Sequence, residues 1–412
     1  MSVKNKVLPV TRIAQLDVVR GIAILHIVAY HLWNTFQWVY QNNGYGIAVK
    51  ESSFIPKEFN HIISILASSG VFSVYVFVIL SGLGLYLHNK DVISAKVFYL
   101  KRFKKLLLPF YMAILLILIA HLVTANFLVV TGSSILLHQP VHFSFNLGGL
   151  SAHTVIVASL FPWLFDFSSY YLGQLDPSLW FMPLIVELYL IYPLIILGIK
   201  KYGMRKITEA ALVVSIIYLG VCNTLLHIYA LHAKTLDSAL ANQLPTFLGS
   251  FLFGMFLTTK MTAMKSSGMK KSLLFLFISV IAFIFLFYQK SNLTWQFLSY
   301  PLEGMVTFIV FFNASMLIHK LGFLTHMLIM LARKSYTVFL VHEVYIGIWI
   351  GISEVLFKKL GVYNEGIVFI AVFVPFAIVM YIIASFAEKL DLVGFVWQKI
   401  TNKFRDLKVS NS

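Results

Sequence analysis

Long apolar stretches dominate this sequence and decide what kind of fold it can adopt. Each is about 20 residues, long enough to cross the hydrocarbon core of a bilayer as a helix. Because a bilayer offers the backbone no water, a spanning segment is a helix or a barrel strand, and continuous apolar runs favour helices. The ten predicted spans are 13–38, 62–88, 106–126, 179–199, 209–229, 240–259, 272–289, 297–318, 335–357 and 366–387.

Composition supports the same class. The chain is 59% hydrophobic and 12% charged, and a soluble protein would carry about twice that charged fraction. We therefore predict an all-α integral membrane protein, with residues 1–412 forming a single domain of about ten transmembrane helices in one bundle. The stretch 154–165 is too short to span and is predicted to be re-entrant or interfacial. The single cysteine, Cys222, allows no intrachain disulfide.

The placement of lysine and arginine predicts the orientation. Every second loop is basic, whereas the long loop 127–178 contains no Lys or Arg. By the positive-inside rule, both termini and a short tail at about 388–412 are cytoplasmic, and the loop 127–178 is outside. The same bias accounts for the net charge of +16. No basic run with interleaved aromatic residues lies outside the apolar segments, so nucleic-acid binding is not expected.

The first span carries an unusual polar stripe, in the stretch "RGIAILHIVAYHLW" at 20–33. Arg20 and His31 are eleven residues apart, which is three helical turns plus about 20°, so both lie on one face, about 16 Å apart along the axis. One interpretation is an Asp17–Arg20 pair that joins helices, beside a histidine satisfied in the core. Ionisable residues within a membrane more often mark a functional site, and we favour that interpretation.

Counting 1.5 Å per residue from the predicted span ends assigns depths to the other polar residues. They fall into two layers, which a closed packed bundle would not need. The outer layer contains His31, Glu187 and Glu303, and the inner layer contains Arg20, Ser81, His342 and Glu343.

A basic segment, "KRFKKLLLP" at 101–109, precedes the third span. Such lysines often only follow the positive-inside rule or contact anionic lipid. Arg102 and Lys105 have i, i+3 spacing, which would direct both toward a phosphate-rich ligand at the cytoplasmic side.

Five stretches resemble, in order, the motifs of the acyltransferase 3 family of integral membrane acyltransferases. They are "LDVVRGIAILHIVAYH", "FVILSGLGLYLH", "FYLKRFKKLLLPFY", "LWFMPLIVELYLIYP" and "SYTVFLVHEVYI". The first is similar to the family's opening helix, in which ten residues separate an arginine from a histidine. The five stretches extend over most of the chain, and as a set they are fairly specific.

The resemblance implies a multi-pass protein of the plasma membrane. It implies transfer of an acyl group, commonly acetyl, from cytoplasmic acyl-CoA to a hydroxyl of a surface glycan, lipid or small molecule, as in polysaccharide O-acetylation. Together with the depths, it gives three sets of site residues. They are His31, Arg20 and Glu187 for catalysis, Arg102, Lys105, Ser81 and His342 for donor binding, and Trp180 and Glu303 on the acceptor side.

The expected chemistry needs a base, and an imidazole is suited to this near neutral pH. Acyl-CoA would be a co-substrate, no cofactor is expected to be permanently bound, and no sequence cluster has metal-ligand spacing. Direct transfer and a covalent acyl-histidine intermediate are both compatible with these residues. The alternatives are a transporter or flippase for a polar or glycolipid solute, and a non-catalytic membrane protein that binds lipid or glycan. A transporter would be expected to have inverted repeats or matched broken helices, and neither is visible in the sequence.

Overall fold

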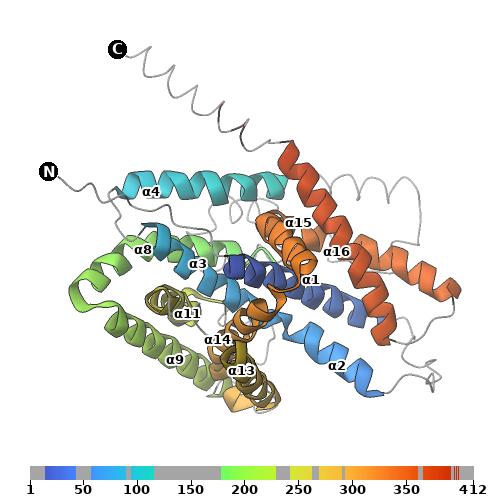
Figure 1. Cartoon of the computed structure of the whole chain (residues 1–412), viewed down its shortest axis with the longest axis horizontal. Coiled ribbons are helices and arrows are strands. Elements are labelled where there is room, and N and C mark those ends of the chain that lie inside the picture. Colours follow the sequence, from blue (N-terminus) through green and yellow to red (C-terminus); the bar gives the residue numbers. More distant parts are fainter. Residues whose placement is uncertain are drawn as a thin grey trace. The chain divides into compact units, whose positions relative to one another are not determined.

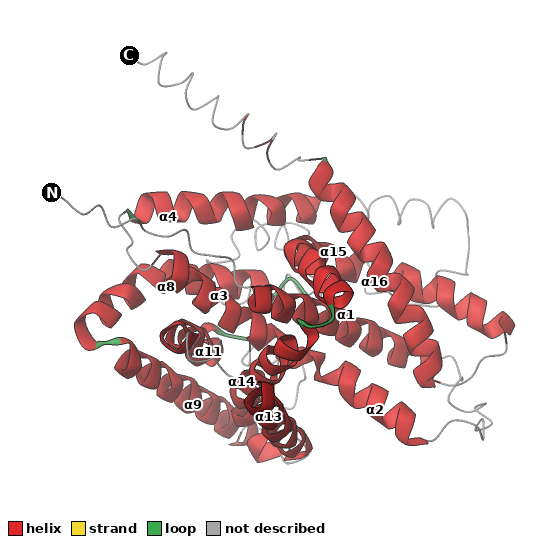
Figure 2. Cartoon of the chain, viewed as in Figure 1, coloured by secondary structure: helices red, strands yellow, loops and turns green. Residues whose placement is uncertain are grey.

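The computed structural model describes residues 14–42, 57–89, 94–115, 178–228, 242–261, 269–289, 293–360 and 365–390, and positions 394, 396 and 398. Within these ranges the chain forms helices and short turns, and no strand (Figure 1, Figure 2). The helical elements are α1 (Ala14–Asn42), α2 (Lys57–Ser68), a 3-10 turn (Ser69–Phe72), α3 (Ser73–Asn89), α4 (Ala95–Arg102), a π turn (Phe103–Leu107), α8 (Phe181–Tyr202), α9 (Met204–Ile228), α11 (Leu244–Leu257), a second 3-10 turn (Thr258–Lys260), α13 (Met269–Gln289), α14 (Leu293–Ile318), α15 (Gly322–Leu360) and α16 (Glu365–Lys389).

Seven helices among the described residues are long and apolar enough to cross a membrane. They match the first, second, fourth, fifth, seventh, eighth and tenth predicted spans. The sixth span corresponds to α11, which has 14 residues, and the ninth lies inside α15. The third span is described only to residue 115. The stretch 154–165 lies outside the described residues, as does the loop 127–178 apart from its last residue.

The structure adds detail to the second and ninth predicted spans. The second is divided by the 3-10 turn Ser69–Phe72, where Leu66 O lies 2.7 Å from His26 Nε2. The His26 side chain, from α1, is thus a hydrogen-bond partner of a carbonyl at the break. The ninth begins at Gly322, not at 335, because its basic residues are accommodated within the helix. Lys334 pairs with Glu388 of α16, which also accepts a 3.0 Å hydrogen bond from Thr337.

The chain divides into two compact units, and the first comprises Met1–Ala23, Phe72–Ile93 and Ile191–Arg333. In this unit α11 packs against α3 and α9, and α14 packs against α3 and α13. A Cβ at Gly82 would lie 2.0 Å from the Phe251 carbonyl oxygen, and one at Gly254 would lie 2.0 Å from that of Ile79. The absence of these side chains therefore allows the backbones of α3 and α11 to touch.

The second unit comprises Ile24–Val71, Ser94–Leu190 and Lys334–Ser412. One buried cluster joins the segment after the π turn to α8 and α15, through Phe110, Met182 and Leu340. On α16, Phe369 packs edge-on against Trp33 of α1, with ring centroids 4.9 Å apart. These contacts pack the part of α1 beyond residue 24 against α16 and join α8 to α15, and this unit contains the candidate active site.

A close approach at Gly70 fixes the position of α1 one turn before His31. A Cβ added there would lie 2.2 Å from the His26 carbonyl oxygen and 2.6 Å from Tyr30 Cβ. We expect Gly70→Ala to destabilise the protein by about 1–3 kcal/mol, because a backbone atom cannot move aside as a side chain can.

Thermal unfolding of the purified protein in detergent would measure this effect. Gly84→Ala is the matched control, since a Cβ there has nothing within 4 Å and alanine favours a helix. An equal or smaller loss of stability for Gly70→Ala than for Gly84→Ala would contradict the expected clash.

Candidate active site

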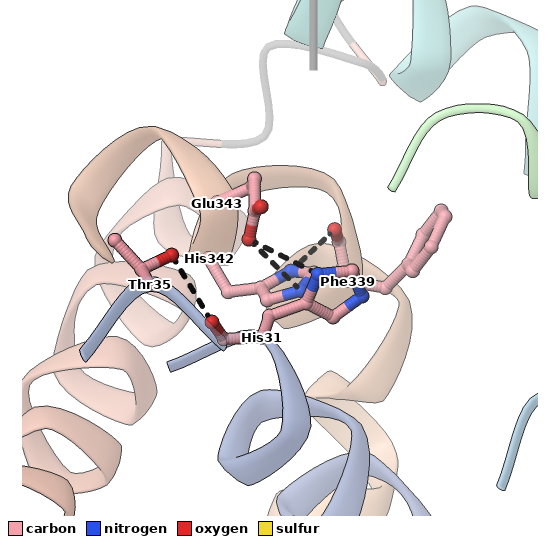
Figure 3. A network of polar contacts seen from close by, with 5 residues as sticks. All are labelled: His31, Thr35, Phe339, His342 and Glu343. Atoms are coloured by element: carbon pink, nitrogen blue, oxygen red, sulfur yellow. Dashed lines mark hydrogen bonds and ion pairs between the residues drawn. The ribbon is translucent and has the colours of Figure 1, made fainter. Parts of the chain in front are cut away.

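His31 of α1 and Glu343 of α15 face each other within the second unit (Figure 3). His31 Nδ1 lies 3.4 Å from Glu343 Oε2, and the two side chains are 15% and 14% exposed. A carboxylate beside Nδ1 favours the tautomer with its proton on that nitrogen, which leaves a lone pair on Nε2. The pair therefore has the composition and spacing of a carboxylate-supported general base.

His342 lies beside this pair and is fully buried. Its ring centroid is 5.1 Å from that of His31, and the two rings are nearly perpendicular. Its Nδ1 is 2.8 Å from the Phe339 carbonyl oxygen, and because a carbonyl can only accept, Nδ1 carries the proton. The Nε2 lone pair then faces Glu343 Oε2 at 4.0 Å. Within the part of the chain that the structure describes, Nε2 has no hydrogen-bond partner.

The helices hold these rings with aromatic and backbone contacts. Tyr30 lies edge-on to His31, with centroids 5.2 Å apart, so the His31 ring contacts one ring on its own helix and another on α15. Thr35, one turn later, donates a 3.2 Å hydrogen bond to the His31 carbonyl oxygen. On α15, Phe339 contacts both His342 and Phe181, at centroid distances of 6.2 and 5.5 Å.

The structure brings His342 and Glu343 together with a residue that the depth count assigns to the other layer. Depth counting placed them in the inner layer with Arg20, whereas the structure places them against His31, an outer-layer residue. The cause is the start of α15 at Gly322. His342 is about 30 Å along that helix, not about 11 Å from a start at residue 335. The role predicted for His342 in donor binding stays a prediction.

Arg102 ends α4 between two aromatic rings. Its guanidinium carbon is 5.4 Å from the ring centroids of both Phe98 and Tyr189, which is a distance for cation–π attraction. Its Nε is buried and has no hydrogen-bond partner among the described residues. An unsatisfied buried donor destabilises a structure by about 1–3 kcal/mol. An anion that accepts a hydrogen bond from this nitrogen would remove that destabilisation.

Lys105 lies in the π turn that follows Arg102. The prediction that both residues share one face assumed an α-helix, and the wider i→i+5 turn changes that spacing. Arg102 is half-buried and Lys105 is exposed. Tyr336 of α15 donates a 2.7 Å hydrogen bond to the Leu106 carbonyl oxygen of this turn. The basic segment is thereby joined to the helix that carries His342 and Glu343.

Three other predicted site residues lie in the first unit. Arg20 Nη1 is 3.4 Å from Asp17 Oδ1, so the pair named in the alternative interpretation is present, but both residues lie on α1 and the pair does not join two helices. Ser81 is half-buried on α3. Glu303 is fully buried on α14. No described contact tests the roles predicted for these three residues, which stay predictions.

Glu187 and Trp180 complete the predicted set and belong to the second unit. Glu187 is half-buried on α8. Trp180 directly precedes that helix and lies edge-on to Phe181, with centroids 6.1 Å apart. Their predicted roles in catalysis and acceptor binding likewise stay predictions.

Glu343 is the residue that sequence reasoning failed to include in the site. The depth count puts Glu343 in the inner layer, but the predicted site residues do not include it. The available signal was two adjacent ionisable residues, His342 and Glu343, inside an apolar helix, which marks a functional site by default. The misplaced helix start concealed their relation to His31.

Comparison with known proteins adds one finding. The acyltransferase 3 family model, described as an acyltransferase domain, matches residues 13–387. The match therefore includes every residue of the candidate active site and the basic segment. The searches of curated proteins and of solved structures gave no match.

Proposed function

Because the chain belongs to the acyltransferase 3 family, we propose that this acyltransferase moves an acetyl group from cytoplasmic acetyl-CoA to a hydroxyl of a cell-surface glycan, lipid or small molecule. The acceptor would be O-acetylated, as in polysaccharide modification. His31 is the catalytic base in this proposal, and acetyl-CoA is a co-substrate with no permanently bound cofactor beside it.

The observation that carries this proposal is the 3.4 Å contact between His31 Nδ1 and Glu343 Oε2. A carboxylate at this position orients the imidazole and stabilises the imidazolium that forms during proton transfer. Both side chains keep part of their surface exposed, at 15% and 14%. This arrangement is suited to removing a proton from a hydroxyl near neutral pH.

The proposed reaction balances with these groups alone. His31 Nε2 accepts the acceptor's hydroxyl proton while the hydroxyl oxygen attacks the thioester carbonyl carbon. A carbon–oxygen bond forms and the carbon–sulfur bond breaks, with its electron pair leaving on the CoA sulfur. His31 returns the proton to that sulfur, which gives free CoA thiol. A covalent acyl-His31 intermediate would use the same nitrogen as its nucleophile.

The environment of Arg102 supports the donor side of the proposal. CoA carries phosphates, and a guanidinium is suited to phosphate because it is planar and permanently charged. The rings of Phe98 and Tyr189 hold this guanidinium. Its buried Nε lacks an acceptor in the described chain, so a phosphate oxygen would supply one. Lys105, exposed nearby in sequence, adds positive charge.

The proposal needs the donor on the cytoplasmic side and the acceptor on the other side. We place the protein in the plasma membrane with ten spans and both termini in the cytoplasm. The distribution of Lys and Arg supports this orientation, since the loop 127–178 lacks both and its neighbouring loops are basic. Arg102 and Lys105 then lie in a cytoplasmic basic segment.

Substituting Glu343 tests its role as a positioning residue. We expect Glu343→Gln to lower kcat by about 10²-fold, a part of the roughly 10²–10⁴-fold that a general base contributes. The glutamine amide would favour the wrong His31 tautomer. The KM for acetyl-CoA should change little, because Glu343 would not touch the donor's phosphates.

Glu343→Asp is the matched variant, since it keeps the carboxylate at a shorter reach. It should recover a measurable part of kcat. Equal losses in the two variants, or a rise in KM that accounts for the whole effect, would argue for a structural role and against positioning.

Thioester consumption by the purified protein tests the proposed function. The protein would be reconstituted with acetyl-CoA and an extract of cell-surface glycans and lipids. Release of CoA thiol should require both protein and extract, and mass spectrometry should find acetyl esters in the extract. Absence of protein-dependent thiol release, or release without an acetylated product, would count against acyl transfer.

A further inference from the structure

His31, His342 and Glu343 form a set of possible metal ligands. Each offers one ligand atom, and these atoms lie within 4.8 Å of one another. Two imidazoles and one carboxylate are the protein ligands of several three-residue Zn²⁺ sites, in which the fourth position stays open. The ligands come from opposite ends of the sequence, so no local spacing could have predicted them.

The state of His342 is a second, independent observation. Its Nδ1 donates to the Phe339 carbonyl oxygen at 2.8 Å, so in the neutral ring Nε2 is unprotonated. Metal-bound histidines usually hold their other nitrogen in this way. The buried Nε2 lone pair and Glu343 Oε2 face each other at 4.0 Å, and Nε2 has no hydrogen-bond partner in the described residues. A cation between these two electron-rich atoms would stabilise both.

Binding of a Zn²⁺ ion would require the three ligand atoms to move closer together. Zn²⁺ bonds of about 2.0–2.1 Å separate tetrahedral ligand atoms by roughly 3.4 Å. The His31–Glu343 distance already has this value, at 3.4 Å. The His342–Glu343 distance of 4.0 Å requires the side chains to close by roughly 0.6 Å, and the His31–His342 pair, which lies within 4.8 Å, by up to roughly 1.4 Å.

We propose that His31, His342 and Glu343 bind Zn²⁺, and that the bound ion switches the acyltransferase off. Two imidazoles favour Zn²⁺ over Mg²⁺ or Ca²⁺, which prefer oxygen ligands. With the ion on His31 Nδ1, the imidazole proton resides on Nε2, and this nitrogen can no longer accept a proton from a hydroxyl. The binding half of the proposal rests on the geometry, and the inhibition half rests on the proposed function.

Equilibrium titration tests the binding half. Chelator-stripped, purified protein would be titrated with Zn²⁺ against a chromogenic chelator. We expect one ion per chain, with affinity reduced about tenfold or more in His31→Ala, His342→Ala and Glu343→Gln, since each removes a ligand. His326→Ala is the matched control, because this histidine lies on the same helix as His342 and is exposed.

Monodisperse elution of each variant in detergent would show that it remains folded. A wild-type protein that binds no Zn²⁺, or equal affinities in all four variants, would overturn the site. So would a loss in His326→Ala that matches the loss in His342→Ala.

Transfer assays test the inhibition half. Zn²⁺ should lower the rate with half-inhibition at the dissociation constant from the titration, and a chelator should restore the rate. Unchanged or faster transfer with the site filled would overturn the inhibition. If the wild-type protein transferred no acyl group at all, the proposed function would fail, while the titration would still decide whether the metal site exists.

Discussion

Replacing His31 by alanine is expected to abolish acyl transfer while leaving the protein folded. The imidazole is the group placed against Glu343, at 3.4 Å, and the reaction requires a proton acceptor at the attacking hydroxyl. A general base contributes roughly 10²–10⁴-fold to a rate, so the remaining activity should be near the detection limit. His31→Gln, which better preserves the side-chain volume, should lose as much.

The measurement is acetyl transfer per mole of monodisperse protein. Thr35→Val is the matched control on the same helix, because Thr35 bonds only the His31 carbonyl among the contacts described above and valine keeps its shape. That variant should retain most of the activity. Near wild-type activity in folded His31→Ala would remove His31 from the mechanism, and an equal loss in Thr35→Val would indicate damage to α1 and not loss of a base.

Removing Arg102 and Lys105 together is expected to weaken acyl-CoA binding by about 10–10²-fold, mainly through half-buried Arg102, because Lys105 is exposed. Each charge-assisted hydrogen bond to a phosphate contributes about 1.5–3 kcal/mol, and every 1.4 kcal/mol is a factor of ten. Arg102→Lys alone should also weaken binding, because lysine keeps the charge but loses the planar group held by Phe98 and Tyr189. Equilibrium binding of a non-hydrolysable acyl-CoA analogue measures these effects.

Two controls separate a specific phosphate site from general positive charge. Lys101→Ala combined with Lys104→Ala removes the same charge from two exposed positions of the same segment, and it should cost less than about tenfold, since exposed charges contribute little. His31→Ala should bind the analogue nearly as well as wild type. Equal losses in the two double variants would mean unspecific attraction, and an equal loss in His31→Ala would mean one mixed site.

Helix positions were largely predictable because apolar length is a local property of the sequence. Seven predicted spans coincide with helices long enough to cross a membrane. The break at Ser69–Phe72 was not predictable from local residues, because His26, more than forty positions earlier, contacts the carbonyl of Leu66 there. The early start of α15 does not follow from the sequence, because a basic residue such as Lys334 beside an apolar stretch is typical of a loop, whereas here Glu388 pairs with it inside the helix.

The candidate site was predictable only in part. The stripe of Arg20 and His31 follows from helical periodicity within one element, and Arg102 follows from a basic segment beside a span. The contact of His31 with His342 and Glu343 depends on the rotation and offset of α1 against α15. Neither quantity follows from the periodicity of a single helix. The sequence alone therefore could not predict that the Glu343 carboxylate lies beside His31.

The π turn at Phe103–Leu107 sets how the helical residues after it are rotated relative to the basic residues before it. The basic residues precede or occupy it, and Phe110, Ala113 and Ile114, which pack into a buried cluster, follow it. An i→i+5 turn takes up about one residue more than an ordinary α-helical turn, so deleting one residue here would restore the α-helical turn and leave Phe110 close to its place in the cluster. Deleting one residue from the α-helical stretch on either side would instead rotate everything downstream by about 100°. The π turn is consequently the place in this segment where a change of length is least disruptive, whereas its neighbours are constrained in length as well as in charge.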